Sequence, residues 1–177
     1  MIQCVFEPQA ELKRFIEINI PRCAERGLPD GGAAIGVIDG DELIGGIYYH
    51  DHDPEAGVLE MSAAATSKRW LTRSTLYTLF HYPFVSIGCQ MVAARHSAND
   101  RALARIFKAY GFNQVTVPRL FGRDEDGIIS TLTDDAWRES KFHSDVRPIS
   151  AKPDFSNASP INTEQPANLD VVHIAVK

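Results

Sequence analysis

The sequence predicts an α/β fold of the α+β kind: a single mixed, mostly antiparallel sheet of about six to seven strands, with helices on both faces and an extended C-terminal tail. Three observations lead to this prediction. Two apolar runs flank a DGD turn at 39–41, which is typical of a hairpin. A strand, a helix and a second strand follow one another between 57 and 96, which predicts a parallel crossover. Two further β-prone runs flank the acidic turn at 123–127.

The first third of the chain predicts a helix followed by the two strands of the hairpin. Leu12, Phe15 and Ile16 recur at helical spacing behind Pro8, and proline fits the first turn of a helix. A loop rich in proline and glycine comes next. We therefore expect a strand at 2–6, a helix at 8–20, a short helical turn at 21–26, and strands at 33–38 and 42–50.

The middle of the chain predicts two helices, each between strands. An apolar stripe with helical spacing runs from Arg69 to Pro83, and proline should end that helix. Asn99 lies near the N-cap of the second helix, and Gly111 fits its C-terminal end. We therefore expect a strand at 57–65, a helix at 69–82, a strand at 89–96, a helix between Asn99 and Gly111, and a closing pair of strands at 112–122 and 127–132.

Composition limits the class of protein. The net charge is −5 over 177 residues, which disfavours a broad nucleic-acid surface because such a surface needs a basic face. No apolar run reaches the roughly 20 residues of a membrane span, and the first residues do not resemble a secretory signal. Cys4, Cys23 and Cys89 lack metal-site or disulfide spacing. We therefore expect reduced thiols, a cytoplasmic protein and no metal site.

The composition changes after about residue 141. We expect one domain at 1–141 and a proline-rich, extended tail at 142–177 that ends in a short β-prone segment, VVHIAVK. That segment is either a free end or a strand that docks on its own sheet edge or on a partner. In the last case the tail would engage a second copy of the chain or another protein.

Positive charge gathers where the helix at 69–82 is expected to begin. Lys68, Arg69 and Arg73 lie there, although cations are disfavoured at a helix N-terminus by the macrodipole. A break of a local rule is frequent at functional sites, so the cluster predicts a bound anion. The alternative is that these three side chains are an ordinary solvated surface.

Three features resemble the GNAT superfamily, the Gcn5-related N-acetyltransferases. They are the strand-to-helix turn after LEMSAAAT, the Asn99 that opens the next helix and the AYGF sequence ending at Phe112. The order of elements is similar as well, and the resemblance covers roughly residues 1–135. Small acetyltransferase-like proteins encoded by tailed phages are also similar. The resemblance implies a GNAT-like fold that binds acyl-CoA.

In that family, pantetheine lies along the fourth strand, which here would be 60–65, and the pyrophosphate lies on the start of the following helix. Small side chains on this strand suit the close approach of a thin ligand. The resemblance thus implies acetyl-CoA as cosubstrate and assigns its binding to ten residues: Met61, Ser62, Ala63, Ala64, Ser67, Lys68, Arg69, Thr72, Arg73 and Asn99.

The turn departs from the family pattern, because 68–73 contains no glycine. Glycines let backbone amides approach phosphate without a Cβ in the way. Two outcomes stay open. Cationic side chains, with the hydroxyls of Ser67 and Thr72, replace the amide contacts, or the site is degenerate.

Two residues are candidates for acid–base chemistry. Glu60 lies on the fourth strand and could take the proton from an ammonium substrate, or it is a surface carboxylate. Tyr110 could protonate the departing thiolate, or it is a core residue; the position of the family's usual tyrosine falls on Phe107 or Ile106. The HDHD sequence at 50–53 is better explained as a polar loop than as a metal site.

The function expected from the resemblance is N-acyl transfer that depends on acyl-CoA. An acetyl group would pass from acetyl-CoA to an unidentified amine by direct attack in a ternary complex. The alternative is a degenerate GNAT-like structural or interaction protein, such as a phage virion or host-interaction component. A virion-associated protein would replace the cytoplasmic location in that case.

Overall fold

The computed structural model describes residues 1–143, 175 and 176. Its strands form one sheet in the order β1-β2-β3-β4-β5-β7-β6, and β8 pairs with β4 aside from this path. The strands are β1 (Ile2–Val5), β2 (Ala33–Asp39), β3 (Glu42–Asp53), β4 (Val58–Ala65), β5 (Met91–Ser97), β6 (Asn113–Gly122), β7 (Glu125–Thr133) and β8 (Ala175–Val176). The pairs along the path are antiparallel except β4–β5, which is parallel.

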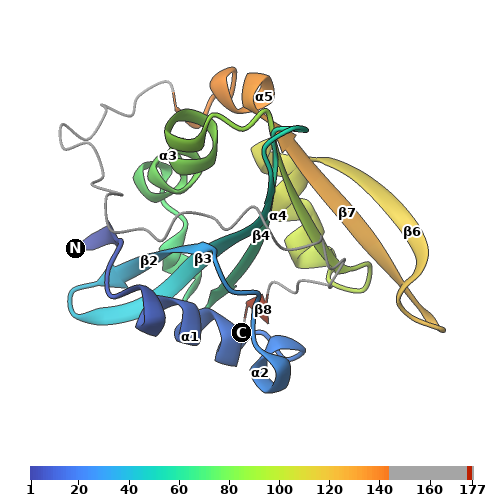
Figure 1. The fold of residues 1–177 in the computed structure, drawn as a ribbon, viewed down its shortest axis with the longest axis horizontal. Coiled ribbons are helices and arrows are strands. Elements are labelled where there is room, and N and C mark those ends of the chain that lie inside the picture. The colour runs from blue at the N-terminus through green and yellow to red at the C-terminus, as the bar shows by residue number, and fades with distance from the viewer. Residues whose placement is uncertain (144–174, 177) are drawn as a thin grey trace.

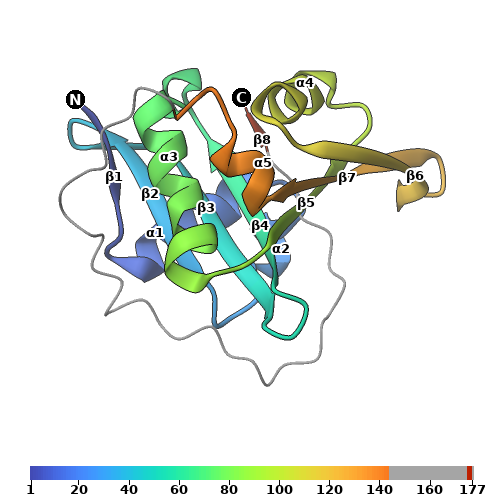
Figure 2. The same cartoon turned by 90° about the horizontal axis from the view of Figure 1, so that it is seen from above.

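Helices cover both faces of this sheet. Figure 1 shows α3 and α5 above the strands and α1 and α2 below them, and Figure 2 shows α3 crossing in front of the sheet with α1 behind it. The helices are α1 (Gln9–Asn19), α2 (Cys23–Arg26), α3 (Arg73–His81), α4 (Arg101–Tyr110) and α5 (Asp134–Arg138), with a 3₁₀ turn η1 (Lys68–Trp70) and a π turn η2 (Tyr82–Ile87). The predicted mixed sheet with helices on both faces is confirmed.

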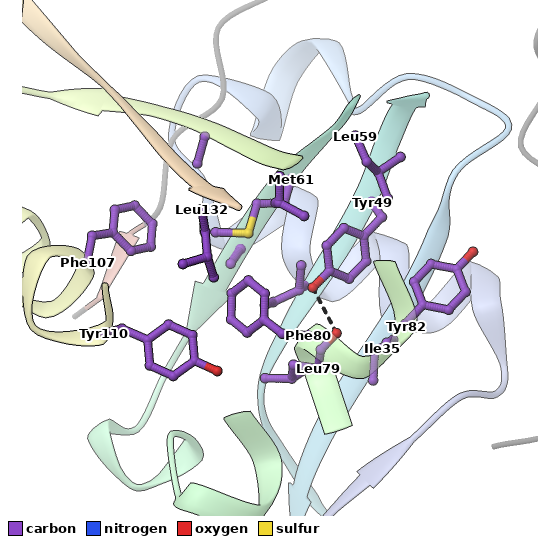
Figure 3. Packing of buried hydrophobic residues seen from close by; sticks show 14 of the residues in the cluster. Ile35, Tyr49, Leu59, Met61, Leu79, Phe80, Tyr82, Phe107, Tyr110 and Leu132 are labelled. Carbon is purple, nitrogen blue, oxygen red and sulfur yellow. Dashed lines mark hydrogen bonds between the residues drawn. The ribbon is translucent and has the colours of Figure 1, made fainter. Parts of the chain in front are cut away.

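β4 separates two cores because alternate residues of a strand point to opposite faces. Leu59, Met61 and Ala63 pack with α3 and α4, whereas Ala64 packs with α1 and α2. We call these the α3/α4 face and the α1/α2 face. Figure 3 shows the first core, where the Tyr49 hydroxyl donates a hydrogen bond of 2.9 Å to the Leu79 carbonyl and ties β3 to α3.

β4 and β5 stay paired over three residues only. Val58, Leu59 and Glu60 pair with Met91, Val92 and Ala93, and the two strands then separate. β5 continues along β7 to Ser97, while the rest of β4 continues along β3 to Ala65. We call the opening between the two strands beyond Glu60 the fork.

The predicted helix at 69–82 is wrong at both ends. Lys68–Trp70 form a 3₁₀ turn, and α3 begins only at Arg73, behind a capping box between Thr72 and Thr75. The buried Trp70 ring explains the break, because it packs against Gly45 of β3 and so pulls the chain onto the sheet before the helix starts. Pro83 does not end the helical segment, since it occupies the beginning of the π turn, where its missing N–H costs little.

Two further details complete the description of the helices. The N-cap of α4 is Asp100, whose side chain accepts a hydrogen bond from the Leu103 amide, and Asn99 lies one residue before it. α5 was not expected from the sequence. Thr133 caps that helix, and Trp137 fixes it to the core from a buried position.

Near the end of the chain, the structure describes Ala175 and Val176. The backbone of Ala175 and Val176 pairs in parallel with Ala64 and Ala65 of β4, as a strand docked on its own sheet would. The remainder of the predicted tail at 142–177, apart from its first two residues, lies outside the described residues, and the division at residue 141 stays a prediction. Within the described part of the chain, no helix is long and apolar enough to cross a membrane.

Candidate functional site

A cavity of about 660 Å³ opens on the α3/α4 face beside the fork. β4 contributes Met61 and Ala63 to its floor, and α3 and α4 contribute apolar walls that include Phe80 and Phe107. Figure 3 shows Met61, Phe80, Phe107 and Tyr110 gathered on this face of the sheet. The cavity is therefore an apolar slot bounded by the strand that the sequence singled out.

Positive charge reaches this cavity from two elements. Lys68 of η1 and Arg105 of α4 line it, together with the carboxylate of Asp100. Lys68 is exposed to solvent, so its ammonium group can turn toward an anion at low cost. An apolar slot with two cations at its edge suits a ligand that is thin and neutral at one end and anionic at the other.

The other two cations of the predicted cluster lie elsewhere. Arg69 forms an ion pair of 2.7 Å with Asp39, and its side chain is 70% exposed. Arg73 is the first residue of α3 and is exposed. Neither residue is among those that line the cavity. Of the three cations, Lys68 is thus the one that the structure brings to the slot.

The predicted hydroxyls serve as helix caps in this structure. Ser67 accepts a hydrogen bond of 3.3 Å from the Arg69 amide, and Thr72 accepts one of 3.1 Å from the Thr75 amide. The capping box of α3 fixes the direction in which the first amides of that helix point, and the N-terminus of a helix is favourable for an anion. The backbone N–H of Asn99 donates a hydrogen bond of 3.1 Å to the Ser97 hydroxyl, and Asn99 does not line the cavity.

Glu60 and Ser62 stand on the α1/α2 face of β4, the opposite side from the cavity. The Glu60 side chain is 24% exposed and lies 3.6 Å from the Arg95 guanidinium. Burial raises the pKa of Glu60 above its ordinary value, although Arg95 acts in the opposite direction. A carboxylate whose pKa is raised accepts a proton more readily than an ordinary one, so Glu60 is suited to acid–base work next to the fork.

His50 makes the most distinctive contacts on this face. Its Nδ1 lies 2.6 Å from a carboxylate oxygen of Asp51, and its Nε2 lies 2.7 Å from the Ser62 hydroxyl. The sequence predicted a polar loop at 50–53, but β3 continues through these residues. The only signal in the sequence was the HDHD run itself, since the serine is twelve residues away.

These groups also meet the first requirement of a metal site. The ligand atoms of His50, Asp51 and Glu60 all lie within 4.8 Å of one another. However, both ring nitrogens of His50 already have polar partners, and Arg95 places a positive charge beside Glu60. A cation would have to displace a hydrogen bond and face that guanidinium, so the contacts favour a hydrogen-bonded cluster.

Tyr110 occupies the wall of the cavity and is 6% exposed. The centroid of its ring lies 5.1 Å from that of the Phe80 ring, and its hydroxyl lies 3.4 Å from Nε2 of His143. Burial raises the pKa of the Tyr110 hydroxyl well above its usual range. The side chain is therefore both a core residue and a protonated group that faces the slot.

The fold is that of known acetyltransferases. No family model and no curated protein matches the chain. The dodecameric spermidine N-acetyltransferase of Vibrio cholerae superposes with a TM-score of 0.62 at 10% identity, over 78% of this chain and 96% of that one. A T. thermophilus protein assigned as an acetyltransferase gives a TM-score of 0.57 at 16% identity, over 77% and 88%. These similarities confirm the GNAT-like fold that the sequence predicted.

Proposed function

We propose that this protein is an N-acetyltransferase that uses acetyl-CoA and transfers the acetyl group directly to an amine while both substrates are bound. The observation that carries the proposal is the fork, where β4 leaves β5 after Glu60 and the cavity opens along Met61 and Ala63. The fold similarity to a spermidine N-acetyltransferase supports this class of reaction.

The cavity fits the shape and charge of an acyl-CoA. Beyond Glu60, the edge of β4 no longer pairs with β5, and β8 pairs with it only at Ala64 and Ala65. The backbone N–H and C=O groups between these two pairings can therefore bond an extended amide chain such as pantetheine. Apolar walls suit the arm, and Lys68 and Arg105 suit the phosphates that follow it. In this proposal, side chains and the first amides of α3 together replace the glycine-rich turn that the sequence lacks.

The chemistry needs little beyond correct placement. Backbone N–H groups of β4 at the fork would polarise the thioester carbonyl, as an oxyanion hole does. Glu60, at the start of the fork, draws a cationic amine and is a candidate for its base. Tyr110, kept protonated by burial, is the candidate that supplies a proton to the thiolate. The amine itself is unspecified.

The test combines binding and turnover. Isothermal titration and thermal shift with acetyl-CoA and CoA should show binding and a higher melting temperature. Release of CoA thiol should then depend on an added amine from a panel of polyamines, amino sugars and peptide N-termini. Burial raises the pKa of Cys4 to about 12 and that of Cys89 to about 11, so these two thiols should react slowly with a thiol reagent at pH 8.

Two outcomes would contradict the proposal. Absence of any thermal shift at millimolar CoA, with the protein folded, would exclude the cosubstrate. Binding of acetyl-CoA without acetylation of any amine in the panel would instead favour the degenerate binding protein that the sequence left open.

A further inference from the structure

Three polar side chains on the α1/α2 face form a single hydrogen-bonded line. It runs from the Ser62 hydroxyl through the His50 ring to the Asp51 carboxylate, with separations of 2.7 and 2.6 Å. Ser62 and His50 are fully buried at 0% and 1% exposure, whereas the Asp51 side chain is 20% exposed. The line therefore connects the interior of the protein with its surface.

This line depends on an unusual backbone conformation. Adjacent residues of a regular strand point to opposite faces, so Asp51 should point away from His50. Instead, Asp51 has a φ of 49°, and the register between β3 and β4 shifts between His50 and Asp53. A left-handed conformation is uncommon for a residue other than glycine and is found most often where a structure needs a particular side-chain direction. Here it returns the carboxylate to the histidine.

The partners define the direction of the hydrogen bonds. An ionised carboxylate only accepts, so Nδ1 of His50 carries the proton that faces Asp51. In the neutral ring, Nε2 is then the acceptor, and the Ser62 hydroxyl donates to it. A carboxylate that holds the imidazole in this tautomer makes the ring ready to take a proton from the hydroxyl and stabilises the imidazolium that forms.

Ser62 lies close to the fork, where acetyl transfer would release a proton. It lies two residues beyond Glu60, the last residue of β4 that pairs with β5, and its neighbours Met61 and Ala63 line the cavity. An amine that attacks a thioester at the fork from the α1/α2 face would approach this hydroxyl. Because Ser62 is shielded from bulk water, a proton released there needs a route through the protein.

We propose that Ser62, His50 and Asp51 form a proton-exit path for the acetyl transfer, an inference that rests on the proposed function. The ammonium of the acceptor gives one proton to Ser62 Oγ as Ser62 passes its own proton to His50 Nε2. The free amine then attacks the carbonyl carbon and forms the C–N bond. Collapse breaks the C–S bond, Tyr110 gives its proton to the thiolate, and the second proton of the nitrogen returns to Tyr110. Asp51 stabilises the imidazolium until its proton leaves to water.

The charged groups around His50 fit this assignment. Asp51 comes from its own strand, Glu60 from β4 and Arg95 from β5, and the Tyr48 ring stacks on the imidazole with centroids 5.7 Å apart. Two carboxylates and one guanidinium leave a net negative environment, which attracts an ammonium. In this assignment Glu60 is the counter-ion of the acceptor, and Ser62 is the group that touches the departing proton.

Two substitutions test the path with little risk to the fold. Asp51→Asn keeps the shape of the side chain, and asparagine tolerates the left-handed conformation at φ 49°, so this variant removes charge alone. Ser62→Ala removes the hydroxyl. His52→Gln is the matched control, because His52 lies on the same strand and is outside the line.

The expected result is a loss of kcat for both variants of at least about tenfold, while the Kd for acetyl-CoA changes less than about twofold. The control variant His52→Gln should keep the wild-type kcat. Glu60→Gln should mainly raise KM for the amine. Wild-type kcat in Ser62→Ala, or loss of kcat in Glu60→Gln alone, would overturn the path and leave the acetyltransferase intact.

A spectroscopic measurement tests the same line without turnover. With ¹⁵N-labelled histidine, the neutral His50 ring should show a proton on Nδ1 and a bare Nε2. A proton on Nε2 in the neutral ring would contradict the path whatever the activity. Absence of acetylation by the wild-type protein with every amine would overturn the proposed function and the path together.

Discussion

The two faces of β4 differ in chemistry although they are built from alternate residues of one strand. Met61 and Ala63 line an apolar cavity on the α3/α4 face, whereas Glu60 and Ser62 meet His50 and Arg95 on the α1/α2 face. One face is suited to hold a long, thin ligand, and the other is suited to move protons. In the proposed function, β4 would divide cosubstrate binding from acceptor chemistry, and the two would meet at the fork.

The largest expected effect comes from filling the cavity. Ala102 is an exposed residue of α4 that lines it, so Ala102→Trp should place an indole in the slot without disturbing the core. We expect the Kd for acetyl-CoA, measured by titration calorimetry, to rise at least about 100-fold, because displaced ligand contacts are lost outright. Lys108→Trp, on the same helix but outside the cavity, should bind normally. Equal binding by both variants would show that the cosubstrate lies elsewhere.

The next effect tests the turn that leads into the cavity. A Cβ on Gly45 would come within 2.8 Å of the Trp70 ring, so Gly45→Ala should lower the free energy of unfolding by about 1–3 kcal/mol. Urea denaturation measures this loss. Adding Trp70→Phe should return part of the stability, since the smaller ring leaves room for the methyl group. The His50 proton signals should stay in place, because the change is confined to the α3/α4 face.

Removal of single cations should have a smaller effect. Lys68→Ala and Arg105→Ala should each weaken CoA binding about tenfold, the size of one charge-assisted hydrogen bond, with a reduced salt dependence. Arg69→Ala is the matched control, because that side chain is paired with Asp39. A tenfold loss of CoA affinity in the Arg69 variant as well would instead support the anion site of three cations that the sequence predicted.

The smallest effect concerns the stability contribution of Glu60. Its raised pKa means that the folded protein holds this proton more tightly than the unfolded chain does. The contribution of Glu60 to the free energy of unfolding is therefore complete below the pKa that this group has in the unfolded chain. It falls as the pH rises through the pKa of the group in the folded protein. Glu60→Gln should gain stability relative to wild type between pH 4 and pH 7, by less than about 1 kcal/mol because the group is partly exposed. The exposed Glu42→Gln should show no such trend.

The fold could be predicted because most of its signals are local. The DGD hairpin, the small-residue strand at β4 and the acidic turn between β6 and β7 each show in a few neighbouring residues. The start of α3 could not be predicted, because it depends on the burial of Trp70 against a glycine of another strand. A short helix such as α5 carries too few periodic positions to be recognised.

The candidate site was predictable in part. The strand that carries Met61 and Ala63, and the carboxylate of Glu60 on its other face, follow from side-chain size and position along the chain. The line of Ser62, His50 and Asp51 does not, since it requires a register between β3 and β4 and a left-handed residue at Asp51. Both are properties of the assembled sheet, and no spacing in the sequence reports them.

The fork has a consequence for the solubility of the protein. A strand edge with unused amides is a template on which another chain can add, and such edges lead to edge-to-edge association and fibres. Here the open length of β4 begins in the middle of the sheet, beside α4 and under α3, and the backbone of β8 pairs with its last two residues. The part of this edge between Glu60 and Ala64, which would accept a pantetheine chain, is thereby kept away from neighbouring molecules.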